Sequence, residues 1–234
     1  MIKKKNDEKI STAKNIDVEY DKMIVYPLEK AIKLSKRLSK TKFDASVEVH
    51  FRLGIDPKKG DQQIRTAVSL PHGSGKKIRV IAFVDETNIN AAKKAGADLI
   101  GDESMIEKIK KTEKTDFDVA VAEPKMMKNL GKIAKILGTR GLMPNPKNET
   151  VTPDPAKAVA ELKKGKVSFK NDDTANIHVV IGKVSFDDKK LIENFKAIDQ
   201  SIRKAKPTKI KGIYIKNISL SSSMGPGVKV KFKQ

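Results

Sequence analysis

Alternating apolar and polar positions mark two half-buried strands early in the chain. In the segment SVEVHFRL, the apolar side chains of Val47, Val49, Phe51 and Leu53 alternate with polar ones. Because successive side chains of a strand point to opposite faces, a period of two is typical of a strand with one buried face. The stretch 64–70 alternates in the same way. Two such strands favour an antiparallel sheet.

The pattern changes in the middle of the chain. Residues 78–84 (IRVIAFV) are almost continuously apolar, as in a strand that is covered on both faces. Shorter apolar stretches at 98–100 and 117–122 alternate with segments of helical periodicity at 105–111 and 124–138. This alternation of strands and helices predicts a small parallel α/β layer.

The antiparallel pattern returns towards the C-terminus. Four segments read as strands: KVSFK, NIHVVIG, GIYIKNISL and GVKVKF. Between the second and the third, Asp187 is placed to cap a long amphipathic helix. Since both chain ends share one pattern and the middle has another, we predict a discontinuous α+β domain from residues 1–67 and 160–234, with an α/β domain inserted at 68–159.

A proline-rich segment interrupts the chain between these patterns. Residues 138–155 (GTRGLMPNPKNETVTPDP) hold four of the ten prolines and two of the fourteen glycines. Each proline fixes φ and lacks an amide donor, and a flexible linker would contain more Gly and Ser, so we expect a stiff, shaped loop. A purely structural role needs no ligand, although Arg140 and Lys147 are also candidates for phosphate contacts.

The charge balance points to a polyanionic partner. Lys and Arg number 49 against 29 Asp and Glu, which gives a formal net charge of +20. Such an excess is typical of nucleic-acid-binding proteins, and a lysine-rich background with solvated surfaces is the alternative. Residues 67–159 carry 16 Lys and Arg against 12 Asp and Glu, whereas the two ends carry 33 against 17. The basic surface is therefore expected on the split domain.

Several kinds of site are excluded or disfavoured by the sequence. It contains no cysteine, which rules out disulfides, thiolate catalysis and cysteine-ligated metals. No run of about 18 apolar residues is present, so we expect no membrane partner. The start MIKKKNDEKI lacks the apolar core of a secretory signal, so we expect a cytosolic protein.

An enzymatic role finds little support. The HGSGKK segment hints at a phosphate-binding loop, but the P-loop pattern needs glycine where Leu70 stands and serine or threonine where Lys77 stands. His50, His72 and His178 are widely spaced and match no metal-binding pattern, which favours structural roles. We predict no catalysis, no cofactor and no metal.

The proline-rich segment also carries a family resemblance. Its GTRGLMPNPK resembles the signature of the ribosomal protein L-one family, the stalk protein of the large ribosomal subunit, in its bacterial form. Further blocks are similar to those of the family in the same order, from about Tyr20 onward: KFDASVEVHFRLGIDPKKGDQQIRTAVSLPHGSGKK, KAGAD, SFKNDDTANIHVVIGKVSF and SSSMGPGVKV.

The resemblance implies a fold of mixed α+β and α/β class, in which a split antiparallel-sheet α+β domain carries an inserted Rossmann-like three-layer α/β domain. It implies binding to structured ribosomal RNA of the large ribosomal subunit, formation of a mobile stalk beside the exit site, and help in releasing deacylated tRNA from that site. It also implies translational repression through a mimic of the RNA site in the protein's own mRNA. A ribosome-associated cytoplasmic protein that is a monomer when free is expected.

Carried over residue by residue, the resemblance implies an RNA-binding site. Its members are Lys42, Phe43, Ser46, Lys59, Asn171, Asp172, Asn217, Ser223, Met224 and Gly225. The two lysines can neutralise phosphates, whereas the serines and Asn217 offer hydrogen bonds to 2′-hydroxyl groups. Gly225 would let RNA approach the backbone closely, and Met224 would lie against sugar faces.

Two positions complicate this site. A phenylalanine just before a strand more often belongs to the core, which is the alternative for Phe43. The family often shows Lys and then Thr-Gly after the Asn-Asp of this block, whereas Asp173, Thr174 and Ala175 stand here. A carboxylate would repel phosphate, so Asp173 is left out of the site.

A generic basic binder, held by lysines alone, is the second alternative. Its affinity would depend on salt and not on RNA structure, whereas contacts specific to RNA shape leave a preference at matched salt.

Overall fold

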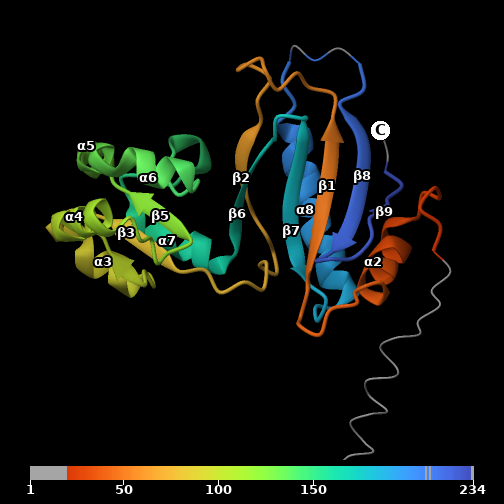
Figure 1. Cartoon of the computed structure of the whole chain (residues 1–234), viewed down its shortest axis with the longest axis horizontal. Coiled ribbons are helices and arrows are strands. Elements are labelled where there is room, and N and C mark those ends of the chain that lie inside the picture. The colour runs from red at the N-terminus through yellow and green to blue at the C-terminus, as the bar shows by residue number, and fades with distance from the viewer. Residues whose placement is uncertain (1–19, 209, 211, 233–234) are drawn as a thin grey trace, which may run out of the picture. The chain divides into compact units, whose positions relative to one another are not determined.

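The two ends of the chain fold together into one body, and the middle of the chain folds into another (Figure 1). The structure, a computed structural model, describes residues 20–208, 210 and 212–232. Of the described residues, unit 1 contains those up to Ile64, Leu70–Gly75 and those from Phe169 onward. Unit 2 consists of Arg65–Ser69 and Lys76–Ser168. Mixed α+β and α/β architecture, with separate sheets, is thereby confirmed. The assignment of residues 1–67 and 160–234 to an RNA-binding domain stays a prediction.

Unit 1 is built on a four-stranded sheet in the order β7-β1-β8-β9. The predicted strand SVEVHFRL forms β1 (Ser46–Leu53) with the expected bounds. It pairs in antiparallel fashion with both β7 (Asn176–Lys183) and β8 (Ile215–Ser222), and β8 pairs with the short β9 (Val228–Lys229). A strand from the N-terminal arm thus lies between two strands from the C-terminal arm.

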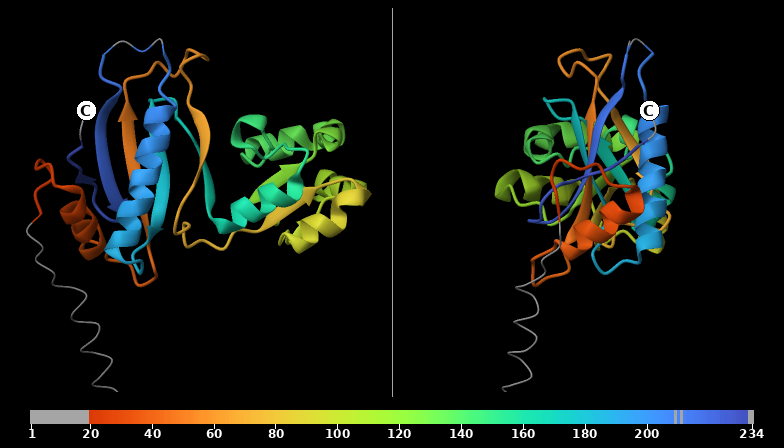
Figure 2. Two further views of the ribbon diagram at one scale, coloured as in Figure 1. Left: turned by 180° about the vertical axis from the view of Figure 1, so that it is seen from behind. Right: turned by 90° about the vertical axis from the view of Figure 1, so that its right-hand side faces the viewer.

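Two helices pack on one face of this sheet, α2 (Leu28–Arg37) and α8 (Asp188–Lys204) (Figure 2). The apolar side chains of β1 point to that face and are buried, as their alternation predicts. The Phe51 ring stacks on that of Phe195 in α8, with centroids 6.1 Å apart. Asp187 precedes α8 as predicted, but its carboxylate makes no capping hydrogen bond.

The second alternating stretch forms β2 (Arg65–Ser69), which does not join the sheet of β1. It pairs instead with β6 (Lys166–Lys170) in a separate two-stranded sheet. Both edges of β1 are occupied by β7 and β8, so β2 cannot pair with β1 itself. The expectation that the two alternating stretches would share one antiparallel sheet is wrong, because β2 belongs to the sheet with β6.

Unit 2 contains a three-stranded parallel sheet in the order β4-β3-β5. The strands are β3 (Val80–Phe83), β4 (Leu99–Ile100) and β5 (Val119–Ala122). The helices are α3 (Ile89–Lys94), α4 (Glu103–Thr112), α5 (Met127–Leu130), α6 (Ala134–Thr139) and α7 (Pro155–Lys164), and 3-10 turns lie at Glu86–Asn88, Pro124–Met126, Gly131–Ile133 and Pro146–Asn148. All four residues of β3 are buried, as a strand covered on both faces requires.

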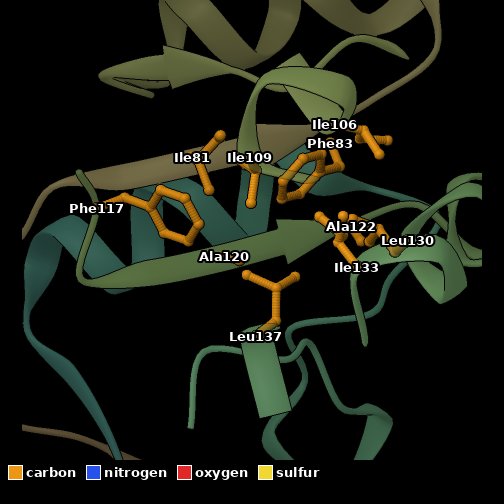
Figure 3. Packing of buried hydrophobic residues seen from close by; sticks show 10 residues of the cluster. All are labelled: Ile81, Phe83, Ile106, Ile109, Phe117, Ala120, Ala122, Leu130, Ile133 and Leu137. Atoms are coloured by element: carbon orange, nitrogen blue, oxygen red, sulfur yellow. The ribbon is translucent and has the colours of Figure 1, made fainter. Parts of the chain in front are cut away.

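Two apolar clusters cover the two faces of β3. Ile81 and Phe83 pack with residues of α4, α5 and α6, and Figure 3 shows the Phe83 and Phe117 rings within this cluster. Val80 and Ala82 belong to the other cluster, which includes residues of α3 and α7. The predicted parallel α/β layer is confirmed.

The proline-rich segment is shaped by hydrogen bonds within unit 2. Val151 forms a parallel bridge with Ala122 at the end of β5. The Ala122 amide donates to the Thr150 carbonyl, and the Thr152 amide donates to the Ala122 carbonyl. The Lys166 ammonium pairs with Glu149 of this segment. The segment is therefore held against the sheet, and α7 follows it within unit 2.

One buried asparagine ties residues 70–75 to the rest of unit 1. The Asn194 side chain of α8 is fully buried, its Oδ1 accepts from the His72 amide, and its Nδ2 donates to the carbonyls of Gly73 and Ile181. Buried polar groups that lose their partners are costly, so this amide is expected to stabilise unit 1 strongly.

Asn194→Ala should lower the free energy of unfolding by about 2–3 kcal/mol, because three backbone groups lose their partner. Urea denaturation followed by circular dichroism measures this change. Asn129→Ala is the matched control, since its exposed amide makes a single hydrogen bond to Glu103, and should change stability by less than about 0.5 kcal/mol. Equal effects of the two substitutions would contradict the role of Asn194.

Two glycines of unit 2 should respond oppositely to alanine. A Cβ at Gly101 would lie 2.1 Å from Cδ1 of the buried Phe83 ring, whereas a Cβ at Gly131 would have no neighbour within 4 Å. We expect Gly101→Ala to destabilise the protein by about 1–3 kcal/mol through overpacking. Gly131→Ala, at a helical φ, should stabilise it by up to about 1 kcal/mol. Thermal unfolding of both variants tests the contrast, and a stable Gly101→Ala protein would disprove the close approach.

Candidate nucleic-acid interface

The face of the unit 1 sheet opposite α2 and α8 is lined with polar side chains. Among the described residues of unit 1, no helix covers this face (Figure 1). We call it the open face. It is formed by Ser46, Glu48, His50 and Arg52 from β1, by Asn176, His178 and Val180 from β7, and by Asn217, Ser219 and Ser221 from β8.

Two predicted site residues meet at one end of the open face. The Ser223 amide donates to the Ser46 carbonyl at 2.9 Å, and the Ser46 amide donates to Ser223 Oγ at 3.2 Å. Lys183, at the end of β7, donates from Nζ to Ser46 Oγ at 3.0 Å. Residues distant in sequence, from the KFDAS and SSSMGPG segments, are therefore side by side.

The turn after β8 presents Met224 to solvent. The Gly225 amide donates to the Ser222 carbonyl at 2.8 Å, and Met224 adopts a positive φ of 60° in this turn. Its side chain is 90% exposed. A Cβ at Gly225 would lie 2.2 Å from Ser222 Oγ, so a larger residue there would force the Ser222 side chain to move. Approach of RNA to the Gly225 backbone stays a prediction.

Phe43 lies at the same end, in the loop that precedes β1. It is 60% exposed, and Lys42 beside it is exposed as well. The alternative that placed Phe43 in the core is wrong, because β1 begins only at Ser46 and its alternation does not extend back to this position. Two exposed apolar side chains, Phe43 and Met224, thus belong to this end of the open face.

The other predicted site residues belong to the opposite end. Asn217 lies opposite Arg52, which is six positions along β1 from Ser46. At about 3.3 Å per residue, the two ends are roughly 20 Å apart. Lys59 follows β1, is exposed, and has its Nζ 3.7 Å from Asp56 Oδ2. The predicted residues therefore form two groups.

Asn171 is engaged in hydrogen bonds within unit 1. Its Oδ1 accepts from the Ile64 amide at 2.7 Å, and its Nδ2 donates to the Asp172 carbonyl at 3.0 Å. These contacts give Asn171 a structural role before any ligand is considered.

Asp172 organises the turn that leads into β7. Its carboxylate accepts from the amide and hydroxyl of Thr174 and from the amide and side chain of Asn176. Burial raises the pKa of Asp172, but these hydrogen bonds outweigh burial and hold the pKa well below its usual range. Ala175 has a φ of 66° in this turn, a conformation that glycine adopts more readily than alanine. Asp173 is exposed.

A pair of histidines occupies the centre of the open face. His50 Nδ1 lies 2.8 Å from His178 Nδ1, His50 Nε2 lies 2.8 Å from Ser221 Oγ, and His178 Nε2 lies 3.5 Å from Asp172 Oδ2. Burial and, secondly, the neighbouring His178 lower the pKa of His50, whereas Glu48 raises it. Sequence reasoning missed this contact, although both residues stand at outward positions of alternating strands.

The third histidine lies elsewhere in unit 1. His72 Nε2 is 2.5 Å from Glu193 Oε2 of α8, the helix on the covered side of the sheet. The open face is therefore the part of unit 1 in which imidazoles contact each other.

Charge and hydrogen-bonding groups are separated on the open face. Serine hydroxyls and imidazoles lie between its ends, together with Val180 and the one acidic residue of β1, Glu48. The amides of Asn176 and Asn217 lie at the end marked by Arg52. Cationic side chains stand towards its ends: Lys42 and Lys183 at one, Arg52 and Lys59 at the other. This arrangement combines hydrogen-bonding groups with phosphate-binding groups.

The described residues offer neither a metal site nor a membrane-spanning helix. No group of three or more His, Asp and Glu side chains in that part of the chain could hold a metal ion. Nor does any helix there combine the length and apolar character needed to cross a membrane.

Comparison with known proteins identifies the family. Residues 32–226, a range that includes every predicted site residue, match the model of the ribosomal protein L1p/L10e family. The large ribosomal subunit protein uL1 of Mycoplasma capricolum subsp. capricolum is 56% identical over 212 residues, which cover 91% of this chain and 93% of the relative. The protein of the same name from Mycoplasma mycoides subsp. mycoides SC is 55% identical with the same coverage. The chain therefore belongs to the ribosomal protein L1p/L10e family.

Proposed function

We propose that this protein is a constituent of the large ribosomal subunit and binds structured ribosomal RNA through the open face of unit 1. Family membership makes it a structural, non-enzymatic ribosomal protein. Its relatives are named as proteins of the large ribosomal subunit, which supports assignment to that subunit.

The chemistry of the open face is the observation that carries the proposal. A-form RNA presents 2′-hydroxyls and base edges in a wide, shallow minor groove, and hydroxyl, amide and imidazole groups on a flat sheet can bond to them. Cationic side chains at the two ends, roughly 20 Å apart, can neutralise phosphates on either side of such a groove. The site residues would act in two groups, one around Ser46 and Ser223 and one around Asn217.

Individual residues receive distinct roles in this proposal. Lys42 and Lys59 would contact phosphates, and Ser46, Asn217 and Ser223 would donate to or accept from sugar hydroxyls. The exposed side chains of Phe43 and Met224 would pack on sugars or bases. Asn171, Asp172 and Gly225 would mainly shape the backbone that RNA meets, given their internal contacts.

Wider roles are proposed from the family resemblance. RNA bound on the open face would form part of a mobile stalk beside the exit site, and unit 2 would contact deacylated tRNA during its release. Arg140 is the candidate in unit 2, exposed and donating from Nη1 to Thr115 Oγ1 at 2.6 Å, with Lys147 as a second. An mRNA that offers the same RNA shape would occupy the open face and repress translation of the protein's own operon. The free protein would be a monomer.

A binder that relies on lysines alone is the competing hypothesis. Its contacts would be spread over basic surfaces and would need no polar sheet face. Polar groups at the centre of the open face and cations towards its ends favour recognition of RNA shape.

In vitro transcribed large-subunit ribosomal RNA should compete at least roughly tenfold better than a random-sequence RNA duplex of equal nucleotide mass, at matched salt. Filter-binding competition at two salt concentrations measures this ratio. Equal competition by the two RNAs at either salt concentration would favour the lysine-only hypothesis.

Met224→Glu should weaken binding of this RNA by roughly tenfold, or about 1.4 kcal/mol, because it places a carboxylate next to proposed RNA contacts. Its side chain is exposed, so unfolding is not expected. Gln200→Glu, at an exposed position of α8 on the covered side of the sheet, adds the same charge and should have little effect. Normal binding by Met224→Glu would place the site elsewhere.

A further inference from the structure

We propose that the contact between His50 and His178 couples RNA binding on the open face to the uptake of one proton. The inference rests on the proposed function, since it takes the open face as the RNA-binding surface. The Nδ1 atoms of His50 and His178 lie only 2.8 Å apart and must share a single proton between them.

The neighbours of the pair determine how the neutral state is arranged. Asp172 is an acceptor at its carboxylate, so His178 Nε2, 3.5 Å from it, carries a proton. His178 Nδ1 is then the acceptor in the neutral pair, and His50 donates to it from Nδ1. His50 Nε2 in turn accepts from the Ser221 hydroxyl. The row therefore runs from Ser221 through His50 to His178, with Asp172 beyond it.

One added proton can be accepted without moving the rings, because the donor and the acceptor exchange roles in the hydrogen bonds of His50 with His178 and with Ser221. His178 becomes an imidazolium that donates from Nδ1 to His50 and from Nε2 towards Asp172. His50 then carries its proton on Nε2 and donates to Ser221 Oγ, whose hydroxyl rotates. A second proton would set two N–H groups against each other across 2.8 Å and break the contact. The pair therefore accepts one proton without rearrangement and resists a second.

The charged groups around the pair leave it sensitive to a polyanion. On the same face of β1 stand Glu48 and Arg52, and the turn before β7 contributes Asp172 and the exposed Asp173. Lys183 ends β7, and Lys216 is the charged residue of β8. Lys229 of β9 lies opposite Ser219.

Bound phosphate groups would add negative charge to these surroundings. Within a Debye length of about 8–10 Å they favour the protonated pair. Burial and, secondly, the neighbouring His178 lower the pKa of His50 in the free protein, and bound phosphates would oppose that effect. Binding of RNA then brings a proton with it, and by linkage a lower pH strengthens binding.

The test compares affinity for in vitro transcribed large-subunit ribosomal RNA at pH 7.5 and pH 5.5 with salt held constant. One proton permits at most about a tenfold change per pH unit, and we expect the wild-type dissociation constant to fall about three- to tenfold over this range. His50→Gln keeps a hydrogen-bonding side chain that does not titrate, and should abolish most of the pH effect, which is measured as the ratio of its own dissociation constants at the two pH values. His72→Gln, the matched control on the covered side, should keep the wild-type pH effect.

A wild-type affinity that does not change with pH, or an unchanged pH effect in His50→Gln, would overturn the proton linkage while leaving the proposed function intact. Absence of RNA binding by the wild-type protein at both pH values would instead overturn the proposed function, and the linkage with it.

A second test uses only the wild-type protein and so does not depend on the folding of a variant. The chemical shifts of the histidine ring protons are followed by NMR as a function of pH, with and without bound RNA. Movement of the midpoint of the pair to higher pH on RNA binding supports the proposal, and an unmoved midpoint overturns it.

Discussion

The pairing of β1 with strands from the far end of the chain is the contact on which the rest of the structure depends. β1 hydrogen-bonds with β7 on one side and β8 on the other, so its buried side chains lie at the centre of the unit 1 core. Without this pairing, the N-terminal arm would have only α2 to bury and the C-terminal arm would have a divided sheet. The same pairing makes unit 2 an insertion between two halves of one body.

The open face follows from the same strands that build the core. An antiparallel sheet needs to bury only one face, and here α2 and α8 cover it. The alternation that sends Val49 and Phe51 inward sends His50 and Arg52 outward. A slip of one residue in register would exchange the two sets, so the core and the candidate interface are specified together.

Much of the fold could be predicted because its signals are local. Alternation gave the bounds of β1, and a continuous apolar run identified β3 as a strand covered on both faces. The partner of β2 could not be predicted, since it depends on which edges other strands already occupy. The exposure of Phe43 could not be predicted either, because it depends on where β1 begins. The contact between His50 and His178 depends on the register between β1 and β7, which the sequence alone does not give. Family motifs named residues at both ends of the open face, but the centre emerged only from strand pairing.

The distance in sequence between β1 and its partners has a consequence for how the protein is made. The partner of Arg52 on β7 is about 120 residues further along the chain. At the pace of translation, β1 leaves the ribosome on the order of ten seconds before β7 does. Unit 2, whose sheet is complete before β7 is synthesised, can fold in the interval. The nascent N-terminal arm must therefore wait with its apolar strand unpaired, and chaperones have their clearest opportunity to bind it then.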